Sequence, residues 1–299
     1  PLGGTTSFSG AGKSLVTSIS PTTGAPIDSN VGGFFGPFLK FSGFDALVVM
    51  GKSDEERIVV IDGARKQIRV ESAPDEAVDT AFDALESLLT QTWQRTMRQR
   101  QFQSNYMAQL EARMGGVQRI YPEFQRPQVA VGQIDVPSFR DLLKVCGRIE
   151  SKIRAPFMIL LHGDFNLNNI LFDATANEIK FIDFYRSDYA DYIQDASVFL
   201  ISHFRLPVFN GGVRNRLNAN AGRFYHFFQS FAKQQADDLF QLRMAMALAR
   251  SFYTSTRFET NRDFAQDMYM RAVYLMETIS RHKGQSWEAY QLPEAILYY

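Results

Sequence analysis

The pattern of hydrophobic and polar positions changes near Pro74, which indicates two structural units. Before Pro74 the chain is rich in Gly, Ser and Thr and contains short β-branched runs, which favour a small sheet with loops. After Pro74 come long amphipathic stretches with few glycines, which predict helices. We therefore expect an α+β protein, with a small β-rich domain at residues 1–74 and a mainly helical domain at residues 75–299.

Short apolar runs in the first unit predict strands separated by turns such as Asp62-Gly63. The predicted strands are Ser14–Ser20, Ala46–Met50, Arg57–Ile61 and Gln67–Val70.

Apolar residues recur at helical spacing through most of the second unit. Two helices are predicted between Asp75 and the glycine pair Gly115-Gly116, and Pro137–Lys152 predicts another. The following chain predicts a hairpin and then a mostly helical region. The hairpin pairs Ile170–Phe172 with Ile179–Ile182, and the helical region runs over Tyr192–Thr278 with a break at Asn210-Gly211-Gly212.

Composition excludes several functional classes. The chain has 299 residues with 32 Lys+Arg against 32 Asp+Glu, and a zero net charge argues against a nucleic-acid partner. Its apolar runs are far shorter than the roughly 20 residues that span a bilayer, so no membrane partner is expected. Cys146 is the single cysteine, which excludes a disulfide framework and a cysteine-rich metal site and favours a cytoplasmic protein. The first residues resemble no secretory signal, and a start inside a longer gene product is an open alternative.

The most informative motif begins at His162-Gly163-Asp164. Asn169 follows Asp164 by five positions, and Asp183 ends the next apolar run. Phosphoryl transfer needs a carboxylate that orients and deprotonates a hydroxyl, together with oxygen ligands that hold Mg²⁺ against nucleotide phosphates. Each residue alone could cap a turn or end a strand, but their order and spacing together favour this chemistry.

At these residues the sequence resembles the aminoglycoside phosphotransferase and choline kinase family, which has a protein-kinase-like fold. The resemblance implies that Asp164 is the catalytic base and that Asn169 and Asp183 bind Mg²⁺. It further implies that Asp195 ties the catalytic loop in place, while the alternative is an acid that favours a helix N-terminus. His162 is expected to support the loop by hydrogen bonding. The similarity covers residues 78–299 and implies a helical C-terminal lobe with a catalytic-loop hairpin.

The second unit departs from this family in two ways. Many relatives have a small residue after the Asp-Phe pair, where this chain has Phe184-Tyr185. The nucleotide-covering loop and the phosphate-binding lysine of an N-terminal lobe have no recognisable counterpart in the sequence. Arg205, Arg214, Arg216 and Arg223 surround the glycine loop at residues 210–212, where they could recognise an anionic acceptor or simply be solvated.

The first unit carries a resemblance of its own, to the N-terminal domain of the tungsten-containing aldehyde ferredoxin oxidoreductases. It rests on four collinear segments: residues 20–24, 28–36, 39–46 and 49–53. The resemblance implies that Asn30, Gly32 and Gly33 face a tungsten or molybdenum pterin, with Lys13 where relatives commonly have an arginine. Turns in a small sheet are the simpler explanation of these glycines.

Three functional hypotheses follow. The first is a phosphotransferase that uses ATP and Mg²⁺ and acts on a hydroxyl group of a small molecule. The second is a pterin-binding fragment of an aldehyde ferredoxin oxidoreductase-like protein. The third is a truncated or composite, non-catalytic chain that associates with the missing part of a longer product.

Overall fold

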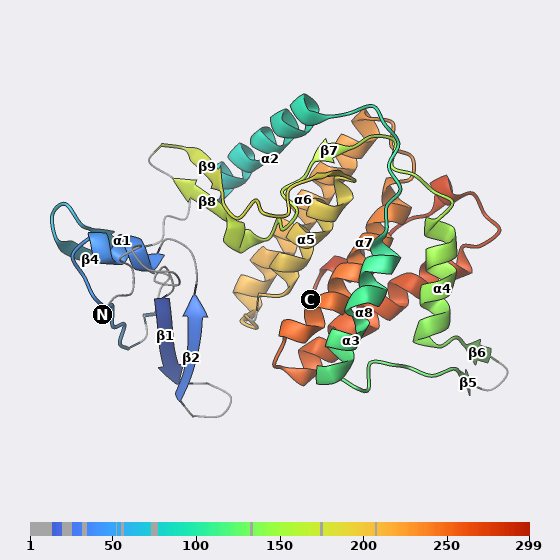
Figure 1. The fold of residues 1–299 in the computed structure, drawn as a ribbon, viewed down its shortest axis with the longest axis horizontal. Helices are drawn as coiled ribbons and strands as arrows, with labels where there is room; N and C mark the ends of the chain where they lie inside the picture. Colours follow the sequence, from blue (N-terminus) through green and yellow to red (C-terminus); the bar gives the residue numbers. More distant parts are fainter. Residues whose placement is uncertain are drawn as a thin grey trace. The chain divides into compact units, whose positions relative to one another are not determined.

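The computed structural model describes residues 14–19, 26–31, 35–51, 53–54, 57–72, 77–131, 134–173, 176–206 and 208–299. The chain divides into two compact units, Pro1–Val78 and Asp79–Tyr299, which Figure 1 colours from blue to red along the sequence. Both helices and strands are present, so the expected α+β class is confirmed. None of the helices in the described ranges is long and apolar enough to cross a membrane.

The described residues of unit 1 form two antiparallel hairpins and a short helix. Strand β1 (Ser14–Ile19) pairs with β2 (Pro26–Val31), β3 (Arg57–Asp62) pairs with β4 (Gln67–Ser72), and α1 spans Phe35–Phe41. Among the described residues of this unit, only Pro37 is buried. Its apolar side chains therefore form no core of their own within the described ranges.

The predicted strand Ala46–Met50 is wrong. These residues have no regular structure, and Val48, Val49 and Met50 are 78%, 73% and 88% exposed. A β-branched run becomes a strand only when another strand satisfies its backbone groups, and no partner pairs with this run in the described chain.

The described residues of unit 2 form seven α-helices, which Figure 1 labels. They are α2 (Ala77–Thr96), α3 (Tyr106–Ile120), α4 (Phe139–Glu150), α5 (Ile193–Phe204), α6 (Gly211–Gln234), α7 (Phe240–Ser255) and α8 (Arg262–Arg281). Helix α7 packs against α3, α5 and α8, and its residues 242–254 are all buried. This helix is the centre of the core because its apolar residues surround its whole circumference.

The aromatic residues of α2 and α6 extend this core. Trp93 is 2% exposed and its ring contacts Tyr192, Phe228 and Phe231. The dense aromatic run of α6 is thus core packing, and it buries a large apolar area.

The helical predictions for unit 2 are largely confirmed. One boundary is wrong, because α3 continues through Gly115 and Gly116 to Ile120. The glycines cost about 1 kcal/mol each in a helix interior, but burial of Met114 and Val117 on the same helix offsets that cost. The region 192–278 also has breaks at residues 235–239 and 259–261, in addition to the predicted glycine loop.

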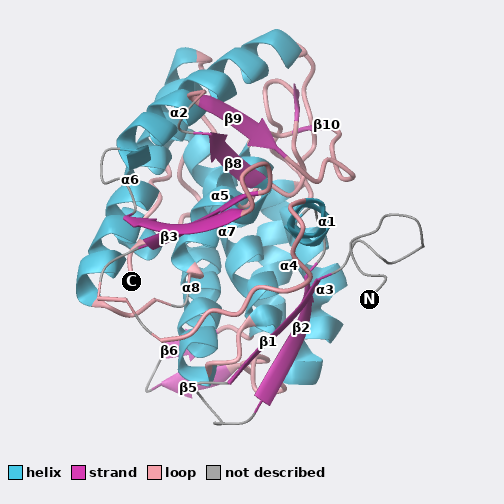
Figure 2. Cartoon of the chain, turned by 90° about the vertical axis from the view of Figure 1, so that its left-hand side faces the viewer, coloured by secondary structure: helices cyan, strands magenta, loops and turns pink. Residues whose placement is uncertain are grey.

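The described residues of unit 2 also form three two-stranded antiparallel sheets, of whose strands Figure 2 labels β5, β6, β8, β9 and β10. They are β5 (Val129–Val131) with β6 (Ile134–Val136), β7 (Ile159–Leu160) with β10 (Tyr189–Ala190), and β8 (Ile170–Asp173) with β9 (Glu178–Phe181). The hairpin predicted between residues 170 and 182 is therefore present, with Ile170 opposite Phe181. Along the chain, strand β7 precedes the predicted loop that carries Asp164, and β8 follows it.

Candidate functional site

The loop that carries Asp164 begins with a backbone conformation that requires glycine. Gly163 has φ +86°, and a Cβ at this position would lie 2.1 Å from the carbonyl oxygen of Arg186. Any other residue would be strained and would also collide with backbone. The glycine therefore lets the loop pass close to residue 186 and turn toward Asp164.

Asp195 on α5 anchors this loop. Its carboxylate is 3% exposed and accepts hydrogen bonds from the backbone N–H of His162 (2.6 Å) and of Gly163 (3.0 Å). Burial raises the pKa of Asp195 to about 7, although these two N–H donors favour its charged form. A rigid helix thus holds the residues that immediately precede Asp164.

Both ring nitrogens of His162 are already occupied. Nε2 lies 2.8 Å from the carbonyl oxygen of Ile182, and Nδ1 accepts from the backbone N–H of Asp164 at 3.3 Å. This pattern assigns the proton to Nε2. His162 therefore joins the loop to the segment that leads to Asp183, and it has no nitrogen available for substrate.

The Asp164 carboxylate is 28% exposed and lies at a cavity. The Asn166 amide donates to Oδ1 at 3.3 Å, and Arg186 Nη1 lies 3.4 Å from Oδ2. These contacts orient the carboxylate while leaving it accessible to a bound molecule.

Asn169 and Asp183 are held next to this loop. The Asn169 amide nitrogen donates to the Asp164 carbonyl oxygen at 2.8 Å, and the backbone N–H of Ile182 donates to the Asn169 carbonyl at 3.1 Å. The amide nitrogen is committed, so the Asn169 side-chain oxygen is available as a ligand. Asp183 is exposed and has φ +69°, a strained conformation for a residue with a Cβ.

Asn169 and Asp183 carry oxygen donors of the kind that Mg²⁺ takes, which typically binds one or two protein oxygens and completes its shell with water and phosphate. Neither residue is among those that line the cavity beside Asp164. The two residues do not form a closed protein site, and the described residues contain no cluster of three or more His, Cys, Asp or Glu suited to a metal. A cation here would depend on phosphate oxygens from a second molecule.

The cavity beside Asp164 has a volume of about 650 Å³, within the usual range for small-molecule sites. Helices α3, α5 and α7, the short helical turn η2 (Thr256–Phe258) and the Asp164 loop supply its walls. Its polar and charged lining includes Gln109, Arg113, Asp164, Asn166, Arg186, Gln194, Ser202, Arg205, Arg250, Ser251, Thr254, Ser255 and Arg257.

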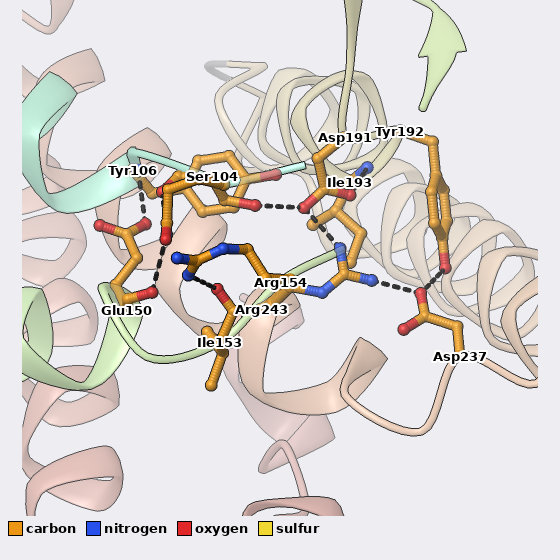
Figure 3. Close-up of polar contacts among 11 residues, drawn as sticks. Ser104, Tyr106, Glu150, Ile153, Arg154, Asp191, Tyr192, Ile193, Asp237 and Arg243 are labelled. Carbon is orange, nitrogen blue, oxygen red and sulfur yellow. Dashed lines mark hydrogen bonds and ion pairs between the residues drawn. The ribbon is translucent and has the colours of Figure 1, made fainter. Parts of the chain in front are cut away.

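A buried ion-pair network lies at the start of α5 (Figure 3). Arg243 of α7 is fully buried and pairs with Asp191 (2.5 Å) and with Asp237. Asp191 also accepts from the Ser104 hydroxyl at 2.7 Å, and the Tyr192 hydroxyl donates to Asp237 at 2.7 Å. Burial opposes the charge on Arg243, but the two aspartates outweigh it and hold the pKa of Arg243 above its usual range. The network fixes the start of α5, the helix that carries Asp195.

Sequence reasoning missed most of the cavity arginines. Arg113, Arg186, Arg250 and Arg257 line the cavity, and only Arg205 was among the candidates. One signal was available: Arg243 and Arg250 are the only charged residues between Phe240 and Ser255 and lie seven positions apart, which indicates buried cations on one helix face.

The other candidate arginines lie elsewhere. Arg214 is 5% exposed and donates to the carbonyl oxygens of Phe204, Leu206 and Val208, so it caps the C-terminal end of α5. Arg223 forms ion pairs with α2.

Of the residues predicted to face a pterin, only Asn30 lies within the described part of the chain. Asn30 lies in β2 opposite Leu15. Gly32, Gly33 and Lys13 lie outside the described residues.

Comparison with known proteins adds two family matches. Residues 74–218 match the Ecdysteroid kinase-like family. This range contains Asp164, Asn169, Asp183 and Asp195, so the kinase-like resemblance of unit 2 is confirmed at the level of a family. Residues 1–104 match the N-terminal domain of aldehyde ferredoxin oxidoreductase, which confirms the second resemblance. No solved structure matches the chain.

Curated relatives match only the N-terminal region. The tungsten-containing aldehyde ferredoxin oxidoreductases of Pyrococcus horikoshii and Pyrococcus furiosus are each 42% identical to this chain over 69 residues. The match covers 23% of this chain and 11% of each relative. The chain thus spans about a tenth of the length of these relatives, and the greater part of the oxidoreductase lies outside the similarity.

Proposed function

We propose that unit 2 is a phosphotransferase that uses ATP and Mg²⁺ to phosphorylate a hydroxyl group of a small molecule. The observation that carries this proposal is the accessible Asp164 carboxylate, which lines a cavity of about 650 Å³ and is anchored through its loop to Asp195. The kinase-like family match over residues 74–218 supports the same class of chemistry.

Asp164 would accept the proton of the acceptor hydroxyl as the hydroxyl oxygen bonds to the γ-phosphorus of ATP. The bond between that phosphorus and the β-phosphate oxygen breaks, and ADP leaves. Asn166 and Arg186 would hold the carboxylate in place, and this positioning is most of what a phosphotransferase must supply.

Asn169 and Asp183 would hold the cation through their side-chain oxygens. When bound, Mg²⁺ neutralises the phosphate charge that develops during transfer. The strained backbone of Asp183 is consistent with this role, because strain of about 1–3 kcal/mol persists at sites where the surrounding structure holds a residue for function.

The test is Mg²⁺-dependent nucleotide turnover in variants of unchanged size. Asp164→Asn and Asp183→Asn should each lower turnover by at least a hundredfold, while Asp238→Asn, an exposed aspartate outside the cavity, should not change it. Normal turnover in Asp164→Asn would refute the assigned base. A rise in melting temperature with Mg²⁺-ATP should accompany activity, because a ligand at 100 times its Kd stabilises the folded state by about 2.7 kcal/mol.

A second candidate function is supported by the identity over 69 residues: a pterin-binding fragment of an aldehyde ferredoxin oxidoreductase-like protein. Of the three residues implied for this cofactor, the structure describes only the backbone of Asn30. Detection of tungsten or molybdenum in the purified protein, together with pterin fluorescence, would support this candidate. Their absence, together with no melting shift by Mg²⁺-ATP, would favour a non-catalytic chain.

A further inference from the structure

The cavity beside Asp164 is strongly cationic. Five arginines line it, and Asp164 is the one acidic residue among its lining residues. The arginines come from separate parts of unit 2: α3, the segment after β9, the end of α5, α7 and the turn η2. The fold therefore collects positive charge at one place in a chain whose net charge is zero.

Acidic side chains compensate only part of this charge. Arg186 lies beside Asp164, and Arg205 Nε pairs with Glu259 at 2.9 Å. Arg113, Arg250 and Arg257 form no ion pair with any carboxylate in the described parts of the chain. Three cations thus share one cavity without an ion pair, although Asp164 acts on Arg113, and Asp195 and Glu150 act on Arg250, at longer range.

Among the three arginines, Arg250 is the most deeply buried. It is 6% exposed, its Nη2 donates to the Ser197 hydroxyl at 3.1 Å, and its Nε is buried without a hydrogen-bond partner. Leaving a charged donor buried and unsatisfied is costly, and because Arg250 lines the cavity, an anion bound there would reduce this cost.

The arginines also disfavour one another. Burial lowers the pKa of Arg113, and nearby Arg186 lowers it further. Burial likewise lowers the pKa of Arg257, with Arg113, Arg186 and Arg205 adding to the effect. A bound anion would relieve this repulsion.

Hydroxyl groups complete the same wall. Ser251, Thr254 and Ser255 follow Arg250 on α7 at spacings that place Arg250 and Thr254 one turn apart on a single helix face. Guanidinium groups combined with hydroxyls are typical of sites that bind carboxylate or phosphate oxygens.

We propose that Arg113, Arg250 and Arg257 bind an anionic oxygen group of the acceptor, so that the acceptor is a small hydroxyl compound carrying a phosphate or carboxylate. This inference rests on the proposed phosphotransferase function, because it assigns the cavity beside Asp164 to the acceptor. The anion holds one end of the molecule at α7 and η2, and a hydroxyl elsewhere on it reaches Asp164.

The experiment is calorimetric titration of the whole chain with inorganic phosphate and, separately, with sodium acetate, at constant ionic strength set by sodium chloride. Arg113→Gln and Arg257→Gln are the informative variants because both residues are only half-buried and their replacement leaves the core intact. Arg148→Gln, an exposed arginine on α4 outside the cavity, is the matched control.

We expect phosphate or acetate to bind the unmodified chain, and each cavity variant to bind it about ten- to a hundredfold more weakly, since hydrogen bonds to charged groups contribute about 1.5–3 kcal/mol. Arg148→Gln should bind as the unmodified chain does. The tighter of the two anions identifies the acceptor's charged group. Equal binding by all variants, or no binding of either anion, would overturn the inference.

Two further measurements separate this inference from the proposed function. Asp164→Asn should retain anion binding while it loses nucleotide turnover. A nonhydrolysable ATP analogue with Mg²⁺ should leave anion binding intact; competition between the two would assign the arginines to nucleotide phosphates and overturn the inference. Normal turnover without anion binding would leave the phosphotransferase standing with an uncharged acceptor.

Discussion

Replacement of Asp195 by asparagine tests how the loop that carries Asp164 is held. The side chain keeps its shape, but only one of its two polar atoms can still accept a hydrogen bond. The wild-type carboxylate accepts one bond at 2.6 Å and another at 3.0 Å. In Asp195→Asn one backbone N–H of the loop would face an NH₂ group instead. Hydrogen bonds to charged groups contribute about 1.5–3 kcal/mol, so turnover should fall about ten- to a hundredfold.

The same variant should change the pH dependence of stability. Burial raises the pKa of Asp195 from 3.8 to about 7 in the folded state, so between about pH 4 and pH 7 the folded state binds this proton and the unfolded state does not. The free energy of unfolding therefore falls as pH rises through this window. At 1.36 kcal/mol per pKa unit, this one group contributes about 4 kcal/mol to the decrease. Asp195→Asn removes this contribution, so its stability should vary less between pH 4 and pH 7.

Glu150 provides a matched control. It is also buried, accepts from the backbone N–H groups of Tyr106 (2.6 Å) and Met107 (3.0 Å), and has a pKa raised to about 7, mainly by burial. It does not line the cavity beside Asp164. Glu150→Gln should flatten the pH dependence in the same direction without lowering turnover.

The assays are urea denaturation at pH 5 and pH 8 and Mg²⁺-dependent nucleotide turnover at pH 8. Equal turnover in the Asp195 and Glu150 variants would refute the anchoring role of Asp195. An unchanged difference in stability between the two pH values in Asp195→Asn would refute the argument from burial.

Substitutions at four further positions test the packing of unit 2. Gly163→Ala should abolish nucleotide turnover because the new Cβ would collide with the Arg186 carbonyl. Gly115 lies in a helix with open space around it, so Gly115→Ala should raise the free energy of unfolding by about 0.5–1 kcal/mol in urea denaturation. Trp93→Ala should lower the free energy of unfolding by about 3–5 kcal/mol, the usual loss for a buried aromatic; a loss under 1 kcal/mol would contradict the packing around α2. Arg243→Ala should cost about 3–5 kcal/mol because two buried aspartates lose their partner, and Arg243→Met should show whether the charge or the volume of the side chain matters.

Local sequence was sufficient for features whose residues are close along the chain. The hairpin that pairs Ile170 with Phe181 depends on two neighbouring apolar runs, and the helix at Phe139–Glu150 depends on a 3.6-residue period. The sequence also predicted Asp164, Asn169 and Asp183 as one group, and hydrogen bonds within the same 20 residues hold this segment together. The roles assigned to these residues remain predictions.

Elements that need a distant partner could not be predicted in this way. Residues 46–50 have the composition of a strand, but no other described strand pairs with them. The extent of α3 beyond Gly115 was likewise missed, because burial of Val117 against the rest of unit 2 outweighs the local preference of glycine.

By itself, the sequence of this protein determined the helical periods, the hairpin turns and the order of the oxygen-bearing residues, because these depend on neighbours within a few positions. Only the tertiary structure decided that Arg113, Arg250 and Arg257 share a cavity with Asp164. These residues are up to 144 positions apart in the numbering and meet because α3, α7 and η2 pack against one another. The charge of the cavity, and hence the acceptor that we propose, is a product of packing between distant elements.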